Sequence, residues 1–126
     1  MKREDVLSRE IVTAAIEVHR NLGPGLLESV YEECLCREFR ERKIACERQV
    51  KLPAKYKGLR LDCGYRLDLV VDRLVILELT AVNRLEPINQ AQLLTYLRLS
   101  GIRLGFLVNF IVLLMKVGIR RVVTNF

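Results

Sequence analysis

The segment from Tyr65 to Val82 constrains the fold more than any other part of this chain. It reads YRLDLVVDRLVILELTAV, a nearly continuous run of residues that favour β-strands. Two stretches, Tyr65–Val71 and Leu74–Leu79, are separated by a short polar turn and predict an antiparallel hairpin. Two acids, Asp68 and Glu78, interrupt this apolar pattern, and their presence in strands calls for an explanation.

Helix and strand patterns alternate on both sides of the hairpin. Apolar residues at helical spacing predict a first helix over roughly Asp5–Asn21, which the GPG sequence ends, and a second over about Gly25–Lys43. A third helix is expected over Pro87–Ser100, because proline suits the first helical turn and Gly101 suits the end. Further strands are expected at Arg48–Pro53, Arg103–Asn109 and Ile119–Thr124, and Tyr56–Arg60 is expected to contain a glycine-centred turn that leads into another strand. The order predicts an α/β (α+β) fold with a mixed β-sheet flanked by helices.

Length and charge limit the classes of function. The 126 residues suit a single domain, 1–126, and the formal net charge of +6 favours an anionic partner such as nucleic acid. The most apolar run, Leu104–Val117, is shorter than the roughly 18 to 20 residues of a membrane helix, so no membrane is expected as partner. The first residues have no signal-peptide pattern, and the cysteine spacing matches neither a zinc site nor a secreted disulfide framework. We therefore expect a cytoplasmic protein with free thiols.

The register of the central hairpin decides where its two acids point. If Asp72, Arg73 and Leu74 form the loop, residues whose numbers sum to about 146 lie opposite each other, so Asp68 faces Glu78. Alternation of strand side chains then gives one apolar face, and another face that carries both carboxylates. A two-residue loop would shift the register by one and separate the acids. In that alternative they are solvent-facing acids on an edge hairpin.

Two carboxylates directly opposite each other repel, so the pair needs a neutralising partner. A divalent cation would remove the conflict. Mg²⁺ is commonly bound by one or two carboxylates, retains several waters and leaves positions for phosphate oxygens. The expected metal is Mg²⁺, with Mn²⁺ as a substitute.

Several motifs resemble those of a known family. GLLESVY at Gly25–Tyr31 matches the pattern G-x-x-E-x-x-Y. The segments around it fall in the family's order and spacing, with VHRNLGPG before it and ERQV, YKG, YRLDLVV, VILELTAV, AQLLTYL and LGFLVNF after it. Over roughly His19–Val123 the chain resembles the GxxExxY protein family, a branch of the PD-(D/E)XK nuclease-like superfamily. The resemblance implies a restriction-endonuclease-like core, with an Asp and a Glu-x-Lys motif that bind Mg²⁺ for phosphodiester hydrolysis in DNA or RNA.

Asp68 and Glu78 match the acids of that pattern, whereas Thr80 stands where the resemblance implies a lysine. Thr80 supplies a hydroxyl but no charge, and losing one preorganised electrostatic partner commonly lowers a rate by about 10² to 10³. Arg66, which the register places opposite Thr80, could stabilise charge but could not accept a proton. We therefore expect impaired nuclease activity.

Further candidates follow from the same resemblance. It places Glu28 in the metal site with Asp68 and Glu78, although an acid in a first helical turn also complements the helix dipole. Gln92 is a candidate to hold water or phosphate, and the alternative is a residue that caps exposed strand ends. His19 and Asn109 are expected to have packing and local hydrogen-bonding roles. Four basic residues are candidate nucleic-acid contacts, or simply a solvated hairpin: Lys51, Lys55, Lys57 and Arg66.

Two functions of different classes remain open. One is a Mg²⁺-dependent nuclease that acts on DNA or RNA through four residues, Asp68, Glu78, Glu28 and Gln92, with Thr80 at the catalytic lysine position lowering or altering its activity. The other is a catalytically inactive nuclease fold that serves as a nucleic-acid-binding or protein-interaction module. Exposed sheet edges are compatible with a homodimer in either case.

Overall fold

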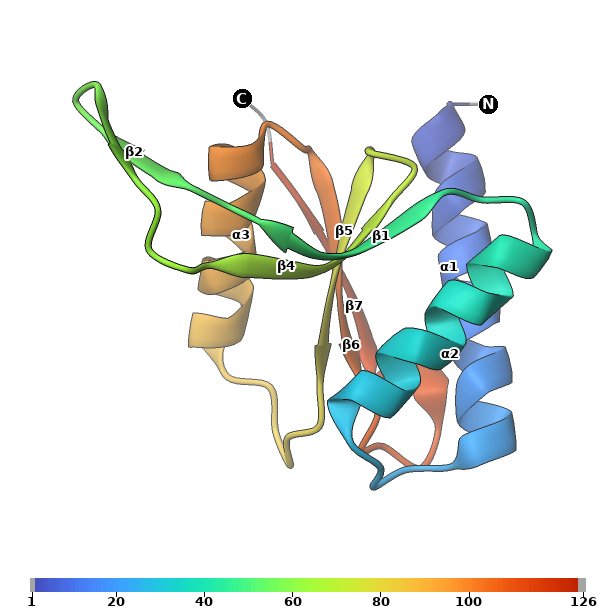
Figure 1. Ribbon diagram of the computed structural model, residues 1–126. Helices are drawn as coiled ribbons and strands as arrows, with labels where there is room; N and C mark the ends of the chain where they lie inside the picture. The colour runs from blue at the N-terminus through green and yellow to red at the C-terminus, as the bar shows by residue number, and fades with distance from the viewer. Residues whose placement is uncertain (1, 125–126) are drawn as a thin grey trace.

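The computed structural model describes residues 2–124 of the chain (Figure 1). All the helices expected from the sequence are present, and the third has the predicted bounds. The helices are α1 (Arg3–Leu22), α2 (Glu28–Glu41), α3 (Pro87–Ser100) and the short 3₁₀ helix η1 (Met115–Val117). The strands are β1 (Cys46–Lys51), β2 (Ala54–Tyr56), β3 (Leu59–Leu61), β4 (Arg66–Val71), β5 (Val75–Thr80), β6 (Leu104–Asn109) and β7 (Ile119–Val123).

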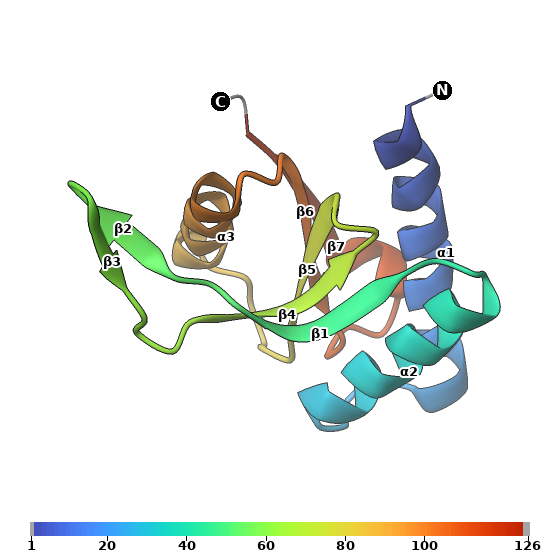
Figure 2. The same ribbon diagram turned by 45° about the horizontal axis from the view of Figure 1, so that its top comes forward.

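Five strands form one mixed sheet in the order β1-β4-β5-β6-β7. Only β5 and β6 are parallel, because α3 carries the chain back across the sheet between them. The remaining strands, β2 and β3, pair as a separate hairpin that projects beyond the sheet (Figures 1 and 2). This arrangement confirms the predicted α/β (α+β) class and is consistent with a restriction-endonuclease-like fold.

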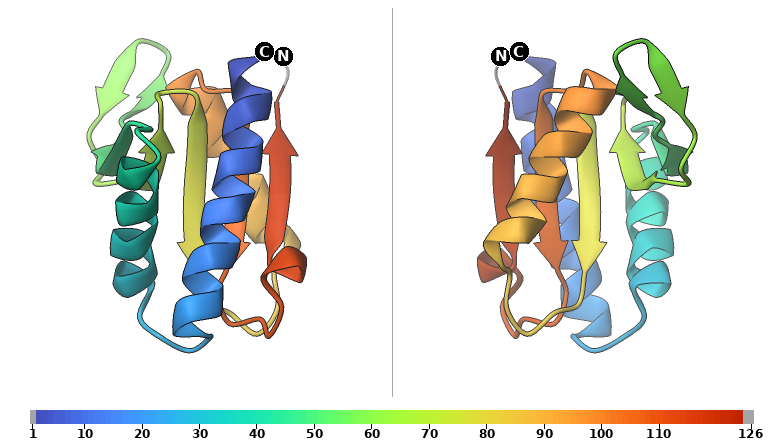
Figure 3. Two further views of the ribbon diagram at one scale, coloured as in Figure 1. Left: turned by 90° about the vertical axis from the view of Figure 1, so that its right-hand side faces the viewer. Right: turned by 90° about the vertical axis from the view of Figure 1, so that its left-hand side faces the viewer.

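Helices cover both faces of the sheet (Figure 3). On one face, α1 and α2 bury an apolar cluster that includes Ile11, Leu35 and the strand residue Leu77. On the opposite face, α3 packs on a second cluster, in which Ile76 and Leu93 are buried. Burying both faces removes most side chains of the central strands β4, β5 and β6 from water, and this burial is the main stabilising contribution to the fold.

The β4–β5 hairpin has the register expected for a three-residue loop. Val71 pairs with Val75 and Leu69 with Leu77, which excludes the two-residue alternative. The loop turns tightly at Asp72 and Arg73, whose φ angles are 52° and 57°. Both side chains tolerate this left-handed region at modest cost, so the turn holds the register that sets the two acids opposite each other.

The expected division of this hairpin into one apolar face and one carboxylate face is wrong in two respects. Val70 and Ile76 share the face of the acids, yet they are buried under α3. Leu67 joins the same α3 cluster, whereas Leu69 packs under α1 and α2. The neighbouring strand is irregular at the same level, where Gln49 has a φ of 50° and the pairing of β1 with β4 skips Gln49 and Asp68.

Candidate active site

Strands β4 and β5 separate where the two acids lie. Regular pairing between them ends at Leu69 and Leu77, while β5 continues alongside β6 as far as Thr80 and β4 continues alongside β1 to Arg66. In this gap, side-chain carboxylates accept the backbone hydrogen bonds that carbonyl oxygens of the partner strand would accept in a regular sheet. The backbone N–H of Asp68 donates to Oε2 of Glu78 at 2.9 Å, and the N–H of Leu79 donates to Oδ2 of Asp68 at 2.8 Å. The two side chains are thereby held between the separating strands.

A cavity of about 230 Å³ opens at this point. It is bounded by α2, β4, β5 and α3, so it combines segments from distant parts of the sequence. Every residue expected in the catalytic and metal sites lines it: Glu28, Asp68, Glu78, Thr80 and Gln92. Asn89, Leu79, Leu93 and Leu107 complete the wall.

Burial and mutual repulsion raise the proton affinity of the acids. Burial raises the pKa of Glu78 to about 8, and the negative charges of Asp68 and Glu32 add to the effect. Burial also raises the pKa of Asp68, although the N–H of Leu79 opposes the change. Without a cation, the pair therefore retains a proton near neutral pH. A positive ion between the carboxylates would allow both to ionise.

The donor set suits a hard cation with oxygen ligands. Asp68 and Glu78 supply two carboxylates and Gln92 an amide oxygen, which is the chemistry that Mg²⁺ and Mn²⁺ prefer. Glu28 lies on the cavity wall with an exposed side chain. Within residues 2–124, no three His, Cys, Asp or Glu side chains form a group able to hold a metal ion by themselves. The residues thus fit a two-carboxylate site, and Glu28 as a third ligand stays a prediction.

No lysine or arginine lines the carboxylate cavity. The expectation that Arg66 would lie opposite Thr80 is wrong, because β4 and β5 have separated before reaching those residues. Arg66 instead pairs with Lys51 on β1 and lines a second cavity. Thr80 is half-buried and pairs with Asn109 on β6.

Tyr31 explains why α2 begins at the cavity. Its ring is fully buried and stacks on Phe110 with centroids 4.0 Å apart. Its hydroxyl donates to the carbonyl of Gly23 at 2.6 Å and accepts the N–H of Leu26 at 3.0 Å. The tyrosine of the G-x-x-E-x-x-Y pattern therefore anchors the loop before α2, and this anchoring places Glu28, in the first helical turn, at the cavity.

Two residues near the site were missed by sequence reasoning. Glu32 is a buried acid that accepts hydrogen bonds from Arg48 Nε at 3.1 Å and from Gln49 Nε2 at 3.1 and 3.2 Å. Asn89 lines the cavity and caps α3 by accepting the N–H of Glu86 at 2.8 Å. Helical spacing could have indicated both, since Glu32 follows Glu28 by one turn and Asn89 precedes Gln92 by one turn.

Other predicted residues have the local roles expected of them. His19 is buried beside Phe110, with its Nε2 2.6 Å from the carbonyl oxygen of Val112. Asn109 bridges to the backbone of Val82, donating to its carbonyl at 2.8 Å and accepting its N–H at 3.2 Å. Both side chains therefore satisfy nearby backbone groups.

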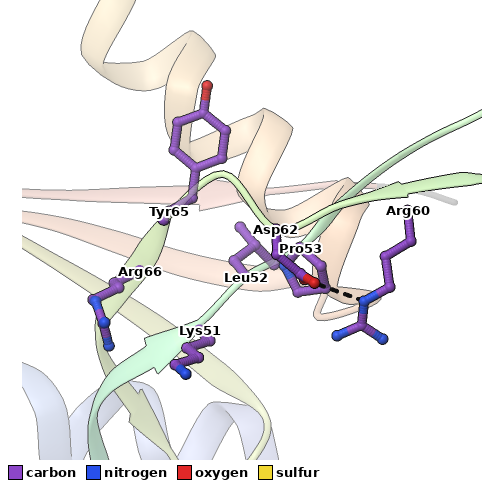
Figure 4. A pocket seen from close by; sticks show the side chains of 8 residues that line it. Lys51, Leu52, Pro53, Arg60, Asp62, Tyr65 and Arg66 are labelled. Carbon is purple, nitrogen blue, oxygen red and sulfur yellow. Dashed lines mark hydrogen bonds and ion pairs between the residues drawn. The ribbon is translucent and has the colours of Figure 1, made fainter.

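The basic residues lie beside the carboxylate cavity and along the projecting hairpin. Lys51 and Arg66 line a cavity of about 420 Å³ together with Arg60 and Asp62 (Figure 4). Lys55 lies on β2, and Lys57 lies in the turn between β2 and β3 with its ammonium over the ring of Tyr56. The structure thus separates an acidic cavity from a basic surface.

Comparison with known proteins adds one identification. None of the helices within residues 2–124 combines the length and apolar character needed to cross a membrane. Searches of curated proteins and of solved structures gave no significant match. Among protein families, residues 5–122 match the PD-(D/E)XK nuclease superfamily, whose members generally use divalent metal ions and act on nucleic acid. This match covers nearly the whole chain, and the chain belongs to the PD-(D/E)XK nuclease superfamily.

Proposed function

We propose that this protein is a Mg²⁺-dependent nuclease of the GxxExxY family that hydrolyses phosphodiester bonds in DNA or RNA, at a rate reduced by Thr80. One observation carries the proposal. The separation of β4 and β5 directs Asp68 and Glu78 into a cavity that Glu28 and Gln92 also line. A superfamily match supplies the nucleic-acid substrate class.

Asp68 and Glu78 would hold the metal ion, Mg²⁺ or Mn²⁺, with Glu28 as a candidate third ligand from α2. When bound, the ion supplies Lewis-acid activation of the phosphoryl oxygen and of an attacking water. Gln92 lies on the α3 wall, where its amide can donate a hydrogen bond to a phosphate oxygen and orient the substrate. Glu28 adds negative charge, which favours a cation over a bare phosphate in this cavity.

Thr80 sets the expected rate. A lysine at this position would place a positive charge beside the phosphate as negative charge develops on it. Thr80 can donate and accept hydrogen bonds but has no charge. Within residues 2–124, no side chain that lines the cavity is cationic. The expected loss is about 10² to 10³ in rate, on the order of 3 to 4 kcal/mol.

The basic surface would contact the nucleic-acid backbone. Lys51 and Arg66 lie on β1 and β4, where Arg66 is two residues from Asp68, and Lys55 and Lys57 lie on the projecting β2–β3 hairpin. A two-stranded ribbon fits the major groove of a duplex, and the hairpin is such a ribbon (Figure 2). Its contacts would be insensitive to base sequence, because lysine and arginine bind phosphates by charge.

A cleavage assay tests the proposal. Purified protein is incubated with end-labelled single- and double-stranded DNA and RNA, in Mg²⁺ or Mn²⁺, beside Asp68→Asn and Thr80→Lys. We expect slow wild-type cleavage, no cleavage by Asp68→Asn and faster cleavage by Thr80→Lys. Asp72→Asn is the matched control and should cleave like wild type. Asp72 lies in the loop between β4 and β5, outside the cavity, and asparagine tolerates its φ of 52°. Equal cleavage by Asp68→Asn and wild type would refute the metal-site assignment.

A second candidate function rests on Thr80 itself. A nuclease fold without the positive charge could have lost hydrolysis and kept binding, as a monomer or a homodimer. Cleavage that appears only in Thr80→Lys would favour this binding module over the active enzyme. Sedimentation of the wild-type protein would determine its oligomeric state in the same preparation.

A further inference from the structure

The opposed cations Lys51 and Arg66 are the most unusual charge arrangement outside the carboxylate cavity. They pair directly across β1 and β4, as Asp68 faces Glu78 across β4 and β5. Like charges directly opposite each other on a sheet destabilise it. Within residues 2–124, neither Lys51 nor Arg66 forms an ion pair with an acid. An anion between them would remove the repulsion.

The surrounding cavity is suited to such an anion. Lys51 and Arg66 extend from neighbouring strands in the same direction, and Arg60 reaches the cavity from β3 (Figure 4). Asp62 is the one acid on the wall, and Arg60 already pairs with it at 3.2 Å. Three cations and one acid leave an excess of positive charge. The volume of about 420 Å³ is within the usual range for small-molecule sites, which is ample for one phosphate group.

The position of this cavity relative to the acids is set by β4. Arg66 and Asp68 are two residues apart on that strand, which corresponds to about 7 Å. The rise of about 3.4 Å per nucleotide is measured along the duplex axis. Because the strand also winds around that axis, adjacent phosphates lie farther apart than the rise, and a step of about 7 Å along β4 is comparable with one phosphate-to-phosphate step. A nucleic-acid strand with one phosphate at Asp68 and Glu78 therefore brings a nearby phosphate of the same strand to Lys51 and Arg66.

We propose that Lys51 and Arg66 form a phosphate subsite that holds a non-reacting phosphate of the strand whose neighbouring phosphodiester lies at Asp68 and Glu78. This inference rests on the proposed nuclease function and narrows the substrate class. The substrate is a polynucleotide strand with at least two phosphates, and a compound with a single phosphodiester uses only the carboxylate cavity. The subsite also offsets part of the loss caused by Thr80. Its positive charges strengthen substrate binding, although they do not stabilise the charge that develops at the reacting phosphate.

Binding without turnover tests the subsite directly. Affinity for a fluorescent single-stranded oligonucleotide is measured by anisotropy in chelator, over a series of salt concentrations, for Lys51→Gln/Arg66→Gln and for Arg120→Gln/Arg121→Gln. The second variant loses the same charge from β7, at the opposite edge of the sheet. We expect the first to weaken binding at least about tenfold and to reduce the slope of log affinity against log salt by about 0.7. Equal losses in both variants would overturn the subsite.

Neutral methylphosphonate linkages locate the phosphate that is bound. One linkage at a time is made neutral along the oligonucleotide, and wild type should lose affinity at one position that Lys51→Gln/Arg66→Gln no longer distinguishes. Should no cleavage occur with any substrate, the nuclease proposal fails, while a position-specific binding loss still supports the subsite. The absence of any position-specific loss would overturn the subsite even if Asp68-dependent cleavage were observed.

Discussion

The pH dependence of stability provides the sharpest test of the carboxylate pair. In the metal-free protein, burial and the neighbouring acids raise the pKa of Glu78 from 4.5 to about 8. The folded protein therefore binds more protons than the unfolded chain between these two values. Consequently, the free energy of unfolding must fall as the pH rises through this window. Glu78→Gln removes the ionisation while its amide oxygen can still accept the N–H of Asp68.

The size of the effect follows from the change in pKa. Each pKa unit corresponds to about 1.4 kcal/mol. Moving the Glu78 pKa from 4.5 to about 8 therefore places a cost on the order of 5 kcal/mol on the ionised folded state. Relative to wild type, Glu78→Gln should gain most of this stability as the pH rises from about 5 to 9.

Urea unfolding in chelator, repeated across this pH range, measures the difference. Glu41→Gln is the matched control, because Glu41 is an exposed acid at the end of α2, away from the cavity. Its difference from wild type should vary by less than about 1 kcal/mol over the same range. A Glu78→Gln difference that is equally flat would refute the claim that burial and the neighbouring acids raise the pKa of Glu78 in the folded protein.

Two further outcomes follow from the site. Adding Mg²⁺ at about 100 times its dissociation constant should stabilise wild type by about 2.7 kcal/mol, measured as a rise in melting temperature, and Asp68→Asn should show little of this rise. Tyr31→Phe should lower the free energy of unfolding by about 1 to 3 kcal/mol, because the bonds from its hydroxyl to Gly23 and Leu26 are lost while the stacking on Phe110 remains. Urea unfolding tests this change, and an unaltered stability would show that the hydroxyl does not anchor the loop.

Local sequence determined the order of helices and strands and the ends of α3. Pro87 and Gly101 predicted both ends, since one suits a helix start and the other a left-handed end with φ of 77°. These features depend on short-range rules, so they could be read from neighbouring residues alone. For the β4–β5 hairpin the sequence allowed a loop of two or of three residues, and the three-residue loop found in the structure places Asp68 beside Glu78.

Tertiary structure alone decided how the site opens. The strands separate beyond Leu69 because β4 follows β1 while β5 follows β6, and both partners are distant in sequence. The same separation moves Arg66 away from Thr80 and into the basic cavity with Lys51. Glu32 approaches the acids only because α2 packs across β1, through Arg48 and Gln49. Periodicity in the sequence specifies which face of a helix or strand is apolar. The shape of the cavity depends instead on which neighbouring strand each of β4 and β5 follows, and this choice depends on the whole sheet.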